Sequence, residues 1–201
     1  MTVLLVGGVA WVGAHDLDPR KPLASSVKPV SVQVVSLDWK WLFIYPDQGI
    51  ASVNHLTIPA GTRIRFELTS AGVMNSFFVP QLGSQIYTMP RMATKLALQA
   101  DHPGTYPGLS AQFSGDGFAD MRFIVDAVPQ QQFDAWVTAA RNSGASLDGQ
   151  AYADLAKPSK DVAPVTYRDV APGLFGTIVS AGLSSDDPAM CVPPASQRAE
   201  Q

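Results

Sequence analysis

Apolar and polar positions alternate through much of residues 30–128, a period typical of β-strands with one buried face. The clearest case follows a Pro-Ala-Gly turn, where Ile64, Phe66 and Leu68 are separated by charged residues. This alternation predicts a half-buried strand, and we expect it to pair with antiparallel neighbours.

The domain proper is expected to begin near Val30, where valines alternate and then give way to alternating aromatics. The aromatic series predicts one face of a strand: Trp39, Trp41, Phe43 and Tyr45. Short apolar runs bounded by Gly, Pro, Asn or Asp predict further strands at 76–79, 96–98 and 121–125. Regular short strands separated by turns favour a β-sandwich over residues 30–127.

After Pro129 the period changes to that of a helix. Apolar residues recur at i, i+3, i+4 and i+7: Phe133, Trp136, Val137 and Ala140. A second short helix is expected around Tyr152 and Leu155, and a third over 174–183. Residues 128–183 are therefore expected to form a helical C-terminal extension, followed by a disordered polar tail at 184–201.

The first residues of the chain form an uncharged apolar run from Thr2 to Ala14. About 20 apolar residues are needed to span a bilayer as a helix, so this run is too short to span alone. We interpret residues 1–14 as the end of a transmembrane helix, and the proline-containing residues 15–29 as a linker. A buried or fraying N-terminal segment is the alternative.

Composition excludes several classes of protein. Of the 201 residues, 46% are hydrophobic and 15% charged, and the formal net charge is −3. A chain with this balance is neither disordered nor a coiled coil, and it offers no basic surface for nucleic acid. The single cysteine, Cys191, excludes an internal disulfide, a cysteine-rich zinc site and an iron–sulfur cluster.

The sequence contains no recognisable catalytic constellation. His15, His55 and His102 lie in separate segments without ligand-like spacing, which favours surface or interface histidines. No nucleophile elbow, phosphate-binding loop or dinucleotide fingerprint is present. Cys191 stands in the C-terminal tail, where no base is positioned to activate it. We therefore assign no catalytic residue to this chain.

Three segments together resemble subunit II of the haem–copper respiratory oxidases. They read DWKWLFIY at 38–45, MNSFFVPQLG at 74–83 and GLSAQFSG at 108–115. The resemblance implies a mainly β fold: a cupredoxin-like Greek-key β-sandwich facing the periplasm, with the helical C-terminal extension and the remnant of an N-terminal transmembrane helix. This family also has a lipobox cysteine and two transmembrane helices. This chain lacks the cysteine and the first helix.

In the cytochrome c oxidase branch of the family, this domain holds a dinuclear copper A centre. The matching positions in this chain are Asn75, Ser110, Gln112, Ser114, Phe118 and Met121. Asparagine and phenylalanine replace two histidines, serines replace two cysteines, glutamine replaces a glutamate that also serves a magnesium or manganese site, and only the methionine is kept. A copper pair requires thiolates and imidazoles, so we expect no metal here. We interpret Met121 as a core residue alternating with Phe123 and Val125.

This pattern is similar to subunit II of the cytochrome o type ubiquinol oxidases, in which membrane quinol delivers electrons directly to subunit I. The resemblance implies a non-redox subunit of a proton-pumping quinol:dioxygen oxidoreductase in the respiratory chain of a bacterial inner membrane. This chain would hold no cofactor. Its implied partners are oxidase subunit I, which would hold the haems and copper, further oxidase subunits, the membrane, and ubiquinol as substrate of the complex.

The sequence leaves two rival functions open. The rivals are a copper A electron-transfer subunit and a free-standing extracytoplasmic cupredoxin-like binding module. Trp39 matches the tryptophan through which cytochrome c delivers electrons in the copper-bearing branch. Without a copper acceptor behind it, we interpret Trp39 as packing. Asp38 and Lys40, on the opposite strand face, are expected to be solvated or to touch subunit I.

Overall fold

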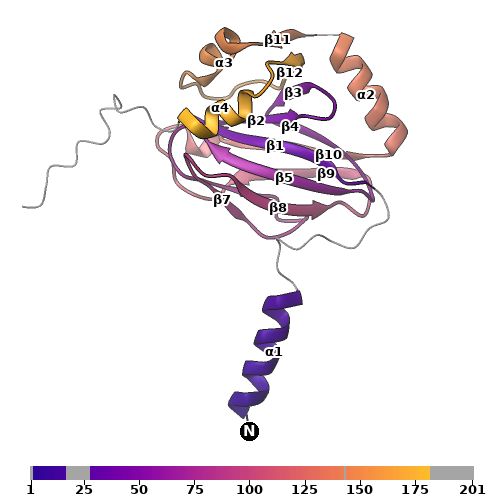
Figure 1. The fold of residues 1–201 in the computed structure, drawn as a ribbon, viewed down its shortest axis with the longest axis vertical. Helices are drawn as coiled ribbons and strands as arrows, with labels where there is room; N and C mark the ends of the chain where they lie inside the picture. Colours follow the sequence, from indigo (N-terminus) through magenta and orange to yellow (C-terminus); the bar gives the residue numbers. More distant parts are fainter. Residues whose placement is uncertain (1, 17–27, 143, 182–201) are drawn as a thin grey trace, which may run out of the picture.

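The structure is a computed structural model that describes residues 2–16, 28–142 and 144–181. The predicted tail at 184–201, Cys191 and most of the predicted linker lie outside the described residues, as do the side chains of His15 and Asp16. The described chain contains two β-sheets that pack face to face, with helices at the C-terminal side (Figure 1). The predicted mainly β cupredoxin-like fold is confirmed.

The larger sheet has seven strands in the order β11-β12-β3-β2-β1-β5-β8. Its strands are β1 (Val30–Leu37), β2 (Lys40–Tyr45), β3 (Ile50–Val53), β5 (Arg63–Ser70), β8 (Thr94–Gln99), β11 (Ala145–Leu147) and β12 (Val165–Val170). The smaller sheet has the order β4-β10-β9-β6-β7. Its strands are β4 (His55–Pro59), β6 (Asn75–Phe78), β7 (Ile86–Thr88), β9 (Gly104–Ser110) and β10 (Arg122–Val128).

The strand predicted from Ile64, Phe66 and Leu68 is β5, and its alternating burial is observed. Its pairing is only partly as expected, because β5 is antiparallel to β8 but parallel to β1. The alternation defines which face is buried and carries no information on strand direction, which depends on how the chain crosses between the sheets.

The core between the sheets is rich in aromatic residues. Phe77 from the small sheet stacks on Phe123, with ring centroids 5.0 Å apart and planes 14° apart. Trp41 from the large sheet meets both rings edge-on, at 5.4 and 5.6 Å. Edge-to-face and offset pairs at these distances stabilise a core beyond the area they bury. The aromatic face predicted for β2 is therefore confirmed for Trp41, Phe43 and Tyr45.

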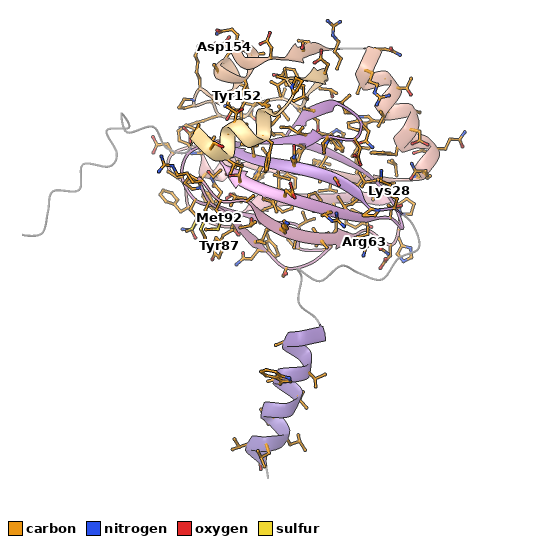
Figure 2. The ribbon with its side chains drawn as sticks, in the orientation of Figure 1. Lys28, Arg63, Tyr87, Met92, Tyr152 and Asp154 are labelled. Atoms are coloured by element: carbon orange, nitrogen blue, oxygen red, sulfur yellow. The ribbon has the colours of Figure 1, made fainter. Side chains whose placement is uncertain are left out.

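Three helices follow the sandwich: α2 (Gln130–Asn142), α3 (Gly149–Ala156) and α4 (Leu174–Ala181). The sequence predicted these helices but not the strands β11 and β12 between them, which extend the large sheet through β3. Helices α3 and α4 cover the outer face of that sheet (Figure 1). Tyr152, on α3, packs against this covered face (Figure 2). The C-terminal region is therefore mixed in structure and continuous with the sandwich.

The N-terminal helix α1 (Thr2–Asp16) presents apolar side chains to solvent. In this chain Val3 is 85% exposed, Leu4 82% and Trp11 69%. Among residues 2–16, 28–142 and 144–181, no helix has both the length and the apolar content needed to cross a membrane.

Candidate functional site

The six positions that the sequence resemblance aligns with copper ligands lie in strands β6 and β9 and in the loop that follows β9. Asn75 begins β6 and Ser110 ends β9, and these strands are antiparallel neighbours. Ser110 Oγ donates to Asn75 Oδ1 at 3.2 Å, and Asn75 Nδ2 donates to the Val73 carbonyl at 3.2 Å. Both side chains are buried, so the hydrogen bonds satisfy polar groups that have lost water.

The loop that follows β9 carries the remaining positions. Met121 is buried, and its backbone nitrogen donates to the carbonyl of Phe118, in the short 3₁₀-helix η1 (Phe118–Asp120), at 3.2 Å. Ser114 Oγ lies 4.0 Å from the Met121 sulfur. Gln112 takes part through its backbone carbonyl, which accepts from Ser110 Oγ at 3.3 Å. We call these six residues the polar corner.

The chemistry of the polar corner is that of hydrogen bonding. The groups that could bind a metal through their side chains are two amides, two hydroxyls and one thioether. Only the thioether, of Met121, is a soft ligand of the kind that copper prefers. In the part of the chain that the structure describes, no three His, Cys, Asp or Glu side chains are close enough to form a metal site. Met121 is buried beside β10, in which Phe123 and Val125 are also buried, as its interpretation as a core residue requires.

Phe113 is a feature of this loop that the sequence did not single out. It is 73% exposed, and the centroid of its ring lies 5.6 Å from that of the Phe118 ring. A strand pattern ends at Ser110, so periodicity says nothing about where the side chains of the following loop point.

Trp39 does not continue the β2 strand as its spacing predicted. It lies in the turn between β1 and β2 with φ at +63°, a left-handed conformation that bulky residues rarely adopt. The ring nevertheless packs, as interpreted from the sequence. Its Nε1 donates to the Ser114 carbonyl at 3.0 Å, and a Cβ at Gly117 would lie 2.3 Å from Trp39 Cδ2. Trp39 is therefore not one of the six residues of the polar corner, but it packs against the loop that carries three of them.

Of the two expectations for Lys40, solvation is wrong, because Lys40 is only 1% exposed. A contact with subunit I stays a prediction. Its ammonium donates to the Lys157 carbonyl at 2.7 Å and to the Ser159 hydroxyl. Desolvation lowers the pKa of Lys40, and the nearby Asp38 carboxylate opposes that shift. A charged residue at the start of a strand is normally solvated, but here the segment after α3 covers it.

His55 forms a pair that sequence spacing could not reveal. Its Nε2 lies 2.7 Å from Asp126 Oδ2, across the parallel strands β4 and β10. Burial disfavours the Asp126 carboxylate, but hydrogen bonds from Thr105 and His55 outweigh it, so the pKa of Asp126 is lowered. His102 is exposed, and its carbonyl accepts from the Tyr106 hydroxyl. Neither histidine lies in the polar corner.

Comparison with known proteins places this geometry in a class. The family model for the periplasmic domain of cytochrome c oxidase subunit II matches residues 48–128, and the model for the COX aromatic rich motif matches residues 141–181. The periplasmic domain of subunit II of cytochrome oxidase from Bradyrhizobium japonicum superposes with a TM-score of 0.54, covering 59% of this chain and 98% of that one at 24% identity. The fold is therefore the cupredoxin-like fold of oxidase subunit II periplasmic domains.

Sequence relatives narrow the class. Cytochrome bo(3) ubiquinol oxidase subunit 2 of Pseudomonas aeruginosa is 51% identical over 178 residues, which are 89% of this chain and 54% of that protein. Ubiquinol oxidase subunit 2 of Acetobacter aceti is 51% identical over 183 residues, 90% of this chain and 59% of that protein. The chain is thus homologous to subunit 2 of ubiquinol oxidases over most of its length, and it spans between half and two thirds of the length of these relatives. The resemblance drawn from the sequence is confirmed.

Proposed function

We propose that this chain is the non-redox subunit II of a quinol:dioxygen oxidoreductase, and that it stabilises the catalytic subunit I from the periplasmic side. The observation that carries the proposal is the polar corner. The sequence resemblance aligns its residues with copper ligands, and in this chain they form hydrogen bonds such as that of Ser110 with Asn75. An electron relay through this domain would need a redox centre that these side chains are chemically unsuited to hold.

The relatives favour this function over its rivals. The two sequence relatives at 51% identity are both named as ubiquinol oxidase subunits. A quinol oxidase takes electrons from a substrate dissolved in the membrane, so a periplasmic relay is unnecessary. In this proposal the haems and copper of the complex, and its proton-pumping machinery, belong to subunit I.

The position of the chain in the cell follows from the same proposal. Helix α1 exposes apolar side chains along its length, including Leu5 at 69% and Val9 at 67%. Lipid tails or other transmembrane helices would bury such a surface, and water would not. We therefore place α1 at the bacterial inner membrane and the sandwich in the periplasm, in contact with subunit I and with further oxidase subunits.

The test is purification of the complex from its native membrane. The full-length gene product would be tagged, solubilised gently and isolated, and its haem content, copper content and quinol-dependent oxygen consumption measured. The proposal predicts that haem-containing subunits and quinol oxidase activity co-purify, with no copper beyond that of the subunit I dioxygen site. Elution of the chain alone and free of haem would instead support the free-standing module. One extra pair of coppers per complex would support the copper A subunit.

A further inference from the structure

The turn between β1 and β2 holds a tryptophan where the backbone favours glycine. Lys40 pairs with Leu37 in the hairpin, so Asp38 and Trp39 form a two-residue turn. Of these two, Trp39 has φ at +63°. A large side chain in this conformation costs free energy, and it persists only where surrounding contacts hold it in place. Those contacts are the evidence for a role of Trp39.

On one side, Trp39 holds the 111–118 loop, which carries three residues of the polar corner. Its Nε1 donates to the Ser114 carbonyl, and its ring lies directly against the backbone at Gly117. Any side chain larger than hydrogen at Gly117 would overlap the ring. The loop and the ring are therefore fitted to each other at two points.

On the other side, the same turn holds the 157–162 segment, which connects α3 to β12. Lys160 Nζ lies 5.4 Å from the centroid of the Trp39 ring, within range of a cation–π contact. The residue after the turn, Lys40 at the start of β2, donates to the Lys157 carbonyl and the Ser159 hydroxyl. Trp39 and the residue after it thus contact both segments, which are separated in the chain by residues 119–156.

We propose that the Trp39–Lys40 turn is a clasp that couples the 111–118 loop to the 157–162 segment, so that the C-terminal region orders a loop which no metal ligand set holds. Trp39 acts as a positioning residue in this clasp. The proposal concerns the order of the loop within the chain, and it stands whether or not the chain serves a quinol oxidase.

The test is hydrogen exchange of the full 201-residue chain in detergent micelles, read by mass spectrometry. Lys40→Met keeps an unbranched apolar side chain, one heavy atom shorter, and removes the ammonium that binds the 157–162 segment. Two loop amides report on order, because Ala111 donates to the Ser76 carbonyl and Phe118 to the Gly115 carbonyl. We expect Lys40→Met to speed their exchange by about tenfold, the scale of losing one charge-assisted hydrogen bond.

A second variant shows whether Trp39 carries the coupling. Trp39→Phe keeps a ring but removes the Nε1–H bond to the loop. In that background, Lys40→Met is expected to change loop exchange by less than about twofold, because residues that act through each other are not additive. The proposal is overturned if Lys40→Met leaves loop exchange unchanged, or if it produces the same increase in both backgrounds.

Two controls separate the clasp from general destabilisation. Arg168→Met removes a positive charge from an exposed position on β12 and is expected to leave loop exchange unchanged. Amides of β5 serve as an internal reference. If Lys40→Met speeds β5 exchange as much as loop exchange, the comparison is made with Ser159→Ala, which removes only the hydroxyl that Lys40 contacts. The proposal is then overturned if Ser159→Ala leaves loop exchange unchanged, or if it produces the same increase in the wild-type and Trp39→Phe backgrounds.

Discussion

The two faces of the seven-stranded sheet carry two different cores. The inner core, between the sheets, is made by residues 30–140 and has a cluster of aromatic rings, including Phe77 and Trp41, at its centre. The outer core is smaller and mostly aliphatic, and it joins Leu42 and Ile44 of β2 to Leu147 and to α4. Strand β2 contributes to both, so all six of its residues are buried.

This difference shows what one strand pattern can and cannot tell. The aromatic alternation of β2 predicts one buried face, and that face is the inner core. The other face bears Leu42 and Ile44, which a two-layer sandwich would expose. It is buried because residues about a hundred positions later in the chain fold back over it. The C-terminal region is therefore part of the folding unit of the sandwich.

The largest expected effect is at the centre of the inner core. Phe77→Ala removes a ring that contacts Trp41, Phe66 and Phe123, and we expect the free energy of unfolding to fall by roughly 3–5 kcal/mol. Urea denaturation in detergent micelles measures the change. The matched control is Phe113→Ala, at a position 73% exposed, with an expected change within about 0.5 kcal/mol. Equal losses in the two variants would refute this description of the core.

Next is the outer core. Phe175→Ala in α4 is expected to cost about 3 kcal/mol, the low end for a buried phenylalanine, because the site lies at the margin of the fold and retains 8% exposure. Thr177→Ala, an exposed change in the same helix, serves as control and is expected to stay within about 0.5 kcal/mol. If Phe175→Ala unfolds α4 without lowering the stability of the sandwich, the two cores are independent, contrary to the shared strand β2.

A smaller effect concerns the pH dependence that Lys40 confers. Burial lowers its pKa from 10.5, so between that lowered pKa and pH 10.5 the unfolded chain binds more protons than the native one. The free energy of unfolding should therefore rise with pH in this window. Lys40→Met should flatten the rise, as measured by urea denaturation at successive pH values.

The window for this measurement is kept below pH 10. Burial raises the pKa of Tyr152 from 10.0 to about 12, so above pH 10.0 the native phenol holds its proton longer than the unfolded one and stability falls with pH. Burial raises the pKa values of Tyr45 and Tyr167 as well, so Tyr152→Phe should weaken that opposing trend without abolishing it. A Lys40→Met variant whose pH profile below 10 matches the wild type would show that the buried ammonium is not desolvated.

The smallest effect is expected at the His55–Asp126 pair, where both side chains are about one third exposed. The pKa of Asp126 is lowered, so its contribution to stability is present above its unfolded pKa of 3.8 and is lost as pH falls through the native value. Asp126→Asn should cost less than about 1 kcal/mol at neutral pH and should flatten the acid limb of the stability profile. Thermal unfolding between pH 3 and pH 7 measures both. An unchanged acid limb would contradict the lowered pKa.

The residues of the polar corner could be named from the sequence, but the contacts of the neighbouring residues Trp39 and Lys40 could not. The corner could be predicted because Asn75 and Ser110 stand at fixed positions in segments that resemble a known family. Trp39 contacts Ser114, 75 positions away, and Lys40 contacts Lys157, 117 positions away, so no local period reports either contact. For the same reason β11 and β12 were missed: each is short, and its pairing partner determines that it is a strand.

The central claim is that the polar corner is closed by hydrogen bonds rather than by copper. It is tested most directly by an equilibrium copper titration of the untagged Cys191→Ser chain, which removes the only thiol, with a competing chelator to measure affinity. We expect this chain to bind no stoichiometric copper more tightly than the chelator does. Binding of one or two copper equivalents that is lost in a Met121→Leu variant would contradict it and would make the polar corner a metal site.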